Sequence, residues 1–296
     1  MIRLIAIVLC FVSASAQAQV TAVDLQGRQV ILSAPAKRIV ALAPHIVENA
    51  YSAGAGDKLV GVVSYSNYPE SAKNIKNVGN YQSWSLEAIV ALEPDLILMW
   101  GSGNGLGALA TLERLGIPIF ISDPAKLEDI PYTIRAIGKL AGTEQVSEPE
   151  AVRLEGEIAG LRNKYASKMP LSIFYQVWDN PLQTLNGEHI ISGVMNLCGG
   201  YNVFADAVSL APKIGLESVL HRNPNAIVAS GMGASRPDWL DDWKRYPSLY
   251  AVKNDGLFFI HPDHIQRPTA RIAMGAKALC EQLDTLRQST NQAAQN

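Results

Sequence analysis

Short β-branched runs alternate with longer helical periods along most of the chain. Four of the apolar runs occupy residues 38–42, 59–63, 95–100 and 117–121, and Pro, Gly or Asn closes each strand. Strands separated by helical stretches are typical of βαβ units and of a mainly parallel sheet. The pattern therefore predicts an α/β protein. Residues 20–33, with Gly27 at their turn, predict an extra hairpin.

The chain also contains an internal repeat. Residues 86–103 contain Leu-Glu-Ala-Ile-Val, then Pro-Asp-Leu-Ile, then Gly-x-Gly, and residues 216–233 contain Leu-Glu-Ser-Val-Leu, Pro-Asn-Ala-Ile and Gly-x-Gly. The offset is 130 at each matched position, as between Glu87 and Glu217 (217 − 87). Each copy predicts a short helix, a turn marked by Pro and a buried strand that ends in a glycine loop. An ungapped match of this length indicates two similar lobes.

These patterns divide the chain into five segments. Residues 147–168 are rich in helix formers, Ser147 and Glu150 have the spacing of a capping box, and Pro170 ends the helix. A long helix between the lobes is a stiff link, so we expect the lobes to move by small angles; the alternative is a surface helix within one domain. The segments are a signal peptide (1–18), an N-terminal α/β lobe (19–145), a connecting helix (146–169), a C-terminal α/β lobe (170–288) and a disordered tail (289–296).

The first eighteen residues have the layout of a secretory signal peptide. A positive start ending at Arg3 precedes an uncharged apolar run over 4–12 and then small and polar residues up to Ala18. The apolar run is short for a bilayer-spanning helix, so a membrane anchor is the weaker alternative. We expect cleavage after Ala16 or Ala18 and a secreted protein.

Charge and cysteine content narrow the function classes. The chain has 25 basic and 27 acidic residues, and loss of Arg3 leaves 24 against 27. Nucleic-acid binding would require a basic excess, so we do not expect it. Cys198 and Cys280 remain after cleavage, and an even pair in an oxidising compartment indicates one disulfide, with two buried thiols as the alternative.

Motifs for catalysis and for metal ions are missing from the sequence. It has no Gly-x-Ser-x-Gly elbow, no His-Glu-x-x-His helix and no Walker loop. The glycines at 101–107 occur at every second position, whereas a dinucleotide fingerprint has the spacing Gly-x-Gly-x-x-Gly. His261 and His264 flank Pro262, and the other histidines are scattered, so a free-ion site fits poorly. We therefore expect no catalytic residue, no metal ligand and no cofactor.

Aromatic residues gather where loops at the carboxyl ends of strands are expected, and ligands of open α/β sheets bind there. Flat rings at such a place can cover a flat macrocycle; the alternative is that each ring anchors its own loop. On the other side, Asp263 and Arg267 are four residues apart and would bind amide or phosphate groups, or simply pair with each other. The aromatic residues are Tyr65, Tyr68, Tyr81, Trp84 and Trp100.

From Arg38 to Gln282 the chain resembles the periplasmic Fe/cobalamin-binding family, and within it the cobalamin receptors. The matching stretches are Val62–Pro69, Leu86–Leu96, Leu197–Gly200 and Asp263-x-x-x-Arg267 before Arg271, Ile272 and Cys280. The resemblance implies a monomeric periplasmic protein that hands a ligand to an ABC importer. It also implies a disulfide between Cys198 and Cys280. The cobalamin contacts that it implies are Tyr65, Tyr81, Trp100, Asp263 and Arg267.

The resemblance gives the repeated glutamates a role, and it shows where this chain departs from the family. Glu87 and Glu217 would meet arginines on a symmetric permease dimer. Where a cobalamin receptor has a tryptophan, this chain has Ala211 and Pro212, so Trp178 is a candidate replacement, beside Trp239 or Trp243. His45 follows the first strand and would touch the ligand or ligate its metal.

Two other functions stay open at this point. A ferric siderophore or haem receptor of the same family would use tyrosines and His45 as iron ligands, although only Arg267 and Arg271 lie together to bind an anionic chelate. A periplasmic enzyme or scaffold belongs to another class of protein. We expect the protein to be a carrier of cobalamin that performs no chemistry on it.

Overall fold

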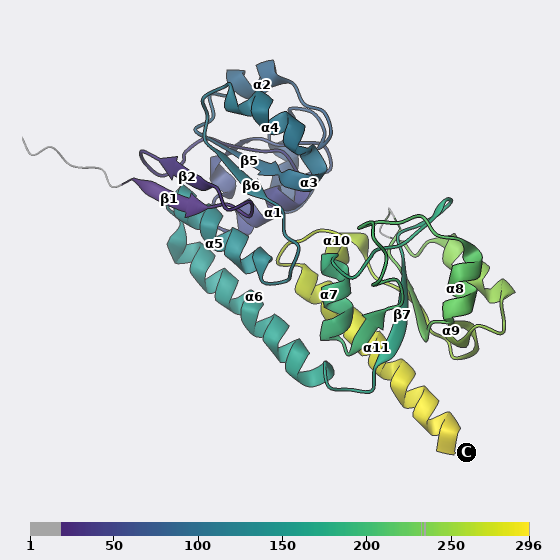
Figure 1. Ribbon diagram of the computed structural model, residues 1–296. Coiled ribbons are helices and arrows are strands. Elements are labelled where there is room, and N and C mark those ends of the chain that lie inside the picture. The colour runs from purple at the N-terminus through teal and green to yellow at the C-terminus, as the bar shows by residue number, and fades with distance from the viewer. Residues whose placement is uncertain (1–18, 232, 234, 296) are drawn as a thin grey trace, which may run out of the picture.

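A single long helix joins two α/β lobes in the computed structural model, which describes residues 19–231, 233 and 235–295 (Figure 1). The predicted signal peptide lies outside the described residues. In the N-terminal lobe the parallel strands are ordered β4-β3-β5-β6. Their bounds are β3 Ile39–Ala41, β4 Leu59–Gly61, β5 Leu96–Trp100 and β6 Ile119–Ser122.

The C-terminal lobe repeats this topology. Its strands are also all parallel, in the order β10-β7-β11-β12, so in both lobes the first strand lies between the second and the third. β5 and β11 carry the two copies of the sequence repeat and occupy the same place in their sheets. The prediction of two similar lobes with parallel sheets is confirmed. The strand bounds are β7 Leu171–Gln176, β10 Gly200–Asn202, β11 Ala226–Ala229 and β12 Leu257–Phe259.

The helices and hairpins complete the two lobes. In the N-terminal lobe these are β1 Val20–Val23, β2 Gln29–Leu32, α1 Pro44–Ser52, η1 Gly56–Lys58, η2 Glu70–Asn74, α2 Leu86–Ala91, α3 Gly101–Asn104, α4 Leu106–Glu113 and α5 Asp129–Ala141. In the C-terminal lobe they are β8 Trp178–Asp179, β9 Leu182–Gln183, α7 Ile190–Leu197, α8 Leu216–Arg222, η3 Asp238–Arg245, α9 Tyr250–Lys253, α10 Pro262–Ile265 and α11 Ile272–Gln295. β1 and β2 pair antiparallel, which confirms the predicted hairpin.

The strands are continuous apolar runs because both faces of each sheet are covered. In β5, Leu96 and Leu98 belong to one core cluster and Ile97 and Met99 to another, as the alternation of side chains in a strand requires. The first cluster also contains Leu154 of the connecting helix and buried residues of the second lobe. The two lobes therefore share one hydrophobic core through the helix that joins them.

The connecting helix, α6, spans Glu144–Tyr165 where the sequence predicted 146–169. The capping-box prediction at Ser147 is wrong, because Thr143 is the N-cap residue and Ser147 is 1% exposed inside the helix. Its side chain packs on α5, where a Cβ added to Gly138 would lie 2.0 Å from the Ser147 Oγ. A small residue is needed at position 147 because it is buried between two helices, and not because it caps a helix end.

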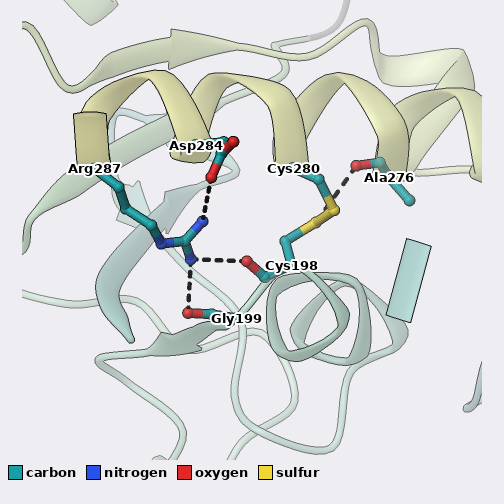
Figure 2. Close-up of a disulfide and its surroundings, with 6 residues drawn as sticks. All are labelled: Cys198, Gly199, Ala276, Cys280, Asp284 and Arg287. Carbon is teal, nitrogen blue, oxygen red and sulfur yellow. Dashed lines mark hydrogen bonds and ion pairs between the residues drawn. A yellow bond between two sulfur atoms is a disulfide. The ribbon is translucent and has the colours of Figure 1, made fainter. Parts of the chain in front are cut away.

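A disulfide joins Cys198, at the end of α7, to Cys280 of α11, so the predicted pairing is confirmed. Figure 2 shows Arg287, about two turns further along α11, donating to the carbonyl oxygens of Cys198 and Gly199 at 2.8 and 2.9 Å. α11 continues to Gln295, so residues 289–295 are helical and not the predicted disordered tail. Ala and Gln there extend a helix that packing has already nucleated.

Candidate functional site

A cavity of about 220 Å³ lies between the two lobes, at the carboxyl ends of β5 and β6. In open α/β sheets this is where ligands bind. Of the predicted contacts, only Trp100 lines this cavity. The residues that line it are Trp100, Ser102, Asp123, Pro124 and Ala125 from the first lobe and Glu188, His189, Ile190, Leu210, Gln266 and Pro268 from the second.

The first-lobe wall of the cleft is aromatic. The rings of Tyr81 and Trp100 are 5.9 Å apart, so the structure brings these two predicted residues together. Asn104 fixes them, because its Oδ1 accepts from the Trp100 amide at 2.6 Å and its Nδ2 donates to the Tyr81 carbonyl at 2.5 Å. The indole lies so close to Gly103 that a Cβ there would be 1.9 Å from a ring atom. Sequence reasoning missed Asn104, although it stands in a glycine-rich loop after a buried strand.

His45 lies beneath this wall and not on the cleft surface. It is 4% exposed, its ring meets the Trp100 ring edge-on at 5.1 Å, and its buried Nε2 has no hydrogen-bond partner among the described residues. Burial, aided by the positive charge of Arg267, lowers the pKa of His45 to about 3. The imidazole is therefore neutral at physiological pH. Whether a ligand reaches it stays a prediction.

The polar groups of the cleft come mostly from residues that the sequence did not single out. Asp123 follows β6 and accepts from the Ser102 hydroxyl at 2.7 Å. His189 is the N-cap of α7, its Nδ1 accepts from the Ile191 amide at 3.2 Å, and burial lowers its pKa to about 4. Its neutral ring leaves Nε2 as a donor. Asp123 could have been found from its place after a strand; Glu188 and His189 carry no comparable signal.

Asp263 and Arg267 form an ion pair at 3.1 Å, but Arg267 is engaged further than the sequence indicated. Glu48 of α1, 2% exposed, accepts from Arg267 at 2.7 Å and from Arg271 at 2.7 Å. We call Glu48, Asp263, Arg267 and Arg271 the inter-lobe ion cluster, because it links the first lobe to the segment between α10 and α11. Two arginines and two carboxylates leave the cluster without net charge.

Tyr65 lies at the edge of this cluster. Its ring is 75% exposed, and its backbone has a positive φ of 67°. Its carbonyl accepts from Arg267 at 3.3 Å, and the Asn67 Oδ1 accepts from the same guanidinium at 2.9 Å. The neighbouring Tyr68 ring lies 4.0 Å from the guanidinium of Arg271. The loop that carries the predicted tyrosine contact is thus tied to the opposite lobe.

The candidate second-lobe tryptophans have different environments. Trp178 of β8 is 38% exposed and donates to the Asn180 carbonyl at 3.0 Å. Trp243 is buried in the lobe core and donates to Gln176 at 2.7 Å, so it cannot replace a cleft aromatic. Trp239 lines a separate pocket within the second lobe. Of the three, Trp178 is exposed, Trp239 is half-buried and Trp243 is buried, so Trp178 remains the best candidate for a ligand contact.

Glu87 and Glu217 are exposed in the first turns of α2 and α8. The two helices lie at the ends of their lobes remote from α6 (Figure 1). Hydrogen bonds from its helix backbone and from the Ser85 hydroxyl lower the pKa of Glu87, so this carboxylate stays charged. The repeat thus places one acidic side chain on each lobe, free to meet a partner.

In the part of the chain that the structure describes, no group of three or more His, Cys, Asp and Glu side chains could hold a metal ion. The rings of His261 and His264 are 4.8 Å apart, with His261 as the N-cap of α10 and Pro262 at its first position. No described helix is both long and apolar enough to cross a membrane.

Two parallel sheets that face a common cleft and share one connecting helix define a two-lobed solute-binding protein. The chain belongs to the periplasmic binding protein family, whose profile matches residues 39–264. The vitamin B12-binding protein of Vibrio campbellii is 37% identical over 254 residues, which cover 86% of this chain and 92% of that protein.

Solved structures show the same relationship. The periplasmic vitamin B12 binding protein BtuF of Vibrio cholerae is 36% identical, with a TM-score of 0.79 and coverage of 86% of this chain and 98% of that one. The periplasmic heme-binding protein RhuT from Roseiflexus is 22% identical, with a TM-score of 0.74 and coverage of 84% and 98%. At that identity the likeness is one of fold alone.

Proposed function

We propose that this chain is a periplasmic receptor that binds cobalamin between its lobes and delivers it to an ABC permease. The vitamin B12-binding relatives support this ligand, since they match most of the chain at more than a third identity. The cleft adds independent support from its charge. The receptor performs no chemistry and needs no cofactor, since its task is to hold and release one solute.

The charge of the cleft is the observation that carries the proposal. Among the described residues that line the cavity there is no lysine or arginine, while Asp123 and Glu188 both reach it. Arg267 and Arg271, near the cleft, are held by Glu48 and Asp263. An adjoining cavity that shares Glu188 is lined by Lys126 and Arg162, and Arg162 pairs with Glu128 at 2.8 Å. Carboxylates accept hydrogen bonds from the amide groups around a corrin ring, and they repel the carboxylates of haem and of many ferric siderophores. A neutral ligand rich in amides fits this cleft best.

The size of the cavity indicates how the ligand is covered. About 220 Å³ is less than the roughly 300–1,000 Å³ of an ordinary small-molecule site, and a corrinoid is larger still. We infer that one edge of the ring enters beside Trp100. The exposed ring of Tyr65 and the half-buried Tyr81 would cover the rest.

To deliver its ligand, the protein would dock on the permease through the ends of the lobes that carry α2 and α8. Glu87 and Glu217 are carboxylates at equivalent places of a duplicated fold, which suits a permease with two equivalent halves. Complementary charge at such sites sets the register and the rate of docking more than the affinity. We propose that a monomer docks in this way after the signal peptide directs the chain to the periplasm.

Calorimetry on the mature protein tests the ligand. We expect one cyanocobalamin to bind, and neither haem nor a ferric catecholate siderophore to bind measurably. A receptor for haem or siderophore would give the reverse result. Absence of heat with cyanocobalamin, confirmed by equilibrium dialysis, would refute the proposed function.

A further inference from the structure

We propose that Glu48 is a positioning residue for ligand binding: it orients Arg267 and Arg271, and through Arg267 it holds Tyr65 in the backbone conformation that presents its ring to the cleft. This inference rests on the proposed function, because it concerns how the first lobe presents a ligand contact. No sequence pattern assigned a role to Glu48.

The burial of Glu48 shows that it is committed to the two arginines. Its carboxylate is 2% exposed and accepts three charge-assisted bonds: from Arg267 at 2.7 Å, and from the Nη2 and Nε of Arg271 at 2.7 and 2.9 Å. A buried charge is tolerated when opposite charges and hydrogen bonds satisfy it in this way. Asp263, the other acid of the inter-lobe ion cluster, is 26% exposed and comes from the same lobe as the arginines. Of the four residues of the inter-lobe ion cluster, Glu48 is the one that belongs to the first lobe, so its carboxylate carries the charged contact between the lobes.

From Arg267 the connection continues to Tyr65. The guanidinium donates to the Tyr65 carbonyl at 3.3 Å and to Asn67 at 2.9 Å. A φ of 67° is uncommon for a residue other than glycine and persists only where neighbouring groups hold it. Tyr65 is 75% exposed, so packing of its side chain does not hold it. The Ser66 amide donates to the Val63 carbonyl at 3.3 Å and closes the turn that contains Tyr65. The bond from Arg267 ties this turn to the second lobe.

Loss of the Glu48 charge would loosen this arrangement. Two guanidinium groups would share Asp263 alone, and their mutual repulsion would favour conformations in which Arg267 turns to solvent. The Tyr65 carbonyl would lose its donor, and the backbone would relax toward ordinary φ values. The ring would then be less often in place for a ligand.

A double-mutant cycle separates positioning from general structural support. We expect Glu48→Gln to weaken cyanocobalamin binding about tenfold, which is the range expected for coupled neighbours. Tyr65→Gly removes the ring, while glycine adopts a positive φ without strain. If Glu48 acts through Tyr65, Glu48→Gln will cost less than about twofold in the Tyr65→Gly background. Equal losses in the two backgrounds would overturn the proposal.

Two further variants keep the test decisive. Asp284→Asn is the matched control, because Asp284 also lies between two cations, Lys168 at 2.5 Å and Arg287 at 3.8 Å, but does not line the cleft. Figure 2 shows its pairing with Arg287. This variant should leave affinity unchanged. If Glu48→Gln does not fold, Glu48→Asp replaces it, because the shorter side chain withdraws the carboxylate from the arginines, and its loss of affinity must show the same dependence on Tyr65. Failure of the unaltered protein to bind cyanocobalamin would refute the proposed function, and additive losses would refute this inference alone.

Discussion

At the scale of single residues, the site is built by buried polar groups under exposed aromatic ones. His45 lies beneath Trp100, and Glu48 lies behind Tyr65. The aromatic residues could be predicted from the sequence, because large rings after buried strands are visible there. Their supports could not, because a histidine or glutamate in a helix looks the same whether it is buried or solvated.

The buried His45 predicts a pH dependence of stability. Its folded-state pKa of about 3 lies below the ordinary value of 6.5, so the unfolded chain binds a proton first as pH falls. The stability that His45 contributes is complete above pH 6.5 and is lost between pH 6.5 and about 3. Between pH 7 and 5 we expect the protein to lose about 2 kcal/mol more than His45→Gln does.

Urea unfolding at the two pH values measures this difference. His221→Gln is the control, since His221 is exposed on α8 and its removal should leave the pH dependence unchanged. If His45→Gln and the unaltered protein lose the same free energy of unfolding between pH 7 and 5, the assignment of His45 as a buried neutral imidazole is wrong.

At the scale of elements, one helix contact attaches the connecting helix to the first lobe, and another ties two helices of the second lobe together. α5 and α6 cross where Gly138 meets Ser147, and α11 is tied to α7 by the disulfide. The sequence predicted the long helix and the cysteine pair. It also predicted a capping role for Ser147, because a serine before a helical pattern is ordinarily a cap. The structure shows that the helix begins earlier and that Ser147 packs against α5.

The crossing of α5 and α6 predicts opposite effects for two glycines. Gly138→Ala would place a Cβ 2.0 Å from the Ser147 Oγ and 2.3 Å from its Cβ, so we expect a loss of about 1–3 kcal/mol in the free energy of unfolding. Gly160→Ala, on the open side of α6, meets nothing within 4 Å and should gain up to about 1 kcal/mol from helix propensity. Urea unfolding compares the two, and equal effects would contradict the close packing.

The disulfide predicts a loss of stability on its removal. It closes a sequence separation of 82 residues, and loop-closure entropy sets an upper value of about 4.5 kcal/mol for its contribution. We expect Cys198→Ser with Cys280→Ser to lower the melting temperature and to leave cobalamin affinity nearly intact, because Cys198 is at the C-terminal end of α7 and the cleft is lined by the N-terminal end. Mass spectrometry of the unreduced protein should find both thiols blocked; free thiols would contradict the bond.

At the scale of the whole molecule, the two lobes are joined at two places, so we expect a narrow range of motion between them. A common hydrophobic core runs through α6, and the inter-lobe ion cluster joins the lobes near the cleft. The duplicated topology places α2 and α8 at equivalent positions of their lobes. A ligand held between the lobes can then be presented together with both acidic helices.

Docking through those helices predicts a selective loss of transport. Replacing Glu87 and Glu217 together by Ala should abolish stimulation of the permease ATPase and leave ligand affinity unchanged, because neither side chain lines the cleft. Replacing Glu144 and Glu281 by Ala removes the same charge from exposed positions on α6 and α11 and should leave stimulation intact. Full stimulation by the first variant would refute the docking proposal.

The sequence by itself determined the duplicated α/β lobes, the helix between them and the aromatic residues offered to a ligand. Those features depend on local periodicity and on a repeat, which are readable one segment at a time. The tertiary structure alone decided that Glu48 meets an arginine 219 positions away, that His45 lies under Trp100 and that Trp243 is part of the core. Such partners depend on how elements far apart in the sequence pack within a lobe and across the cleft, and no local pattern carries that information.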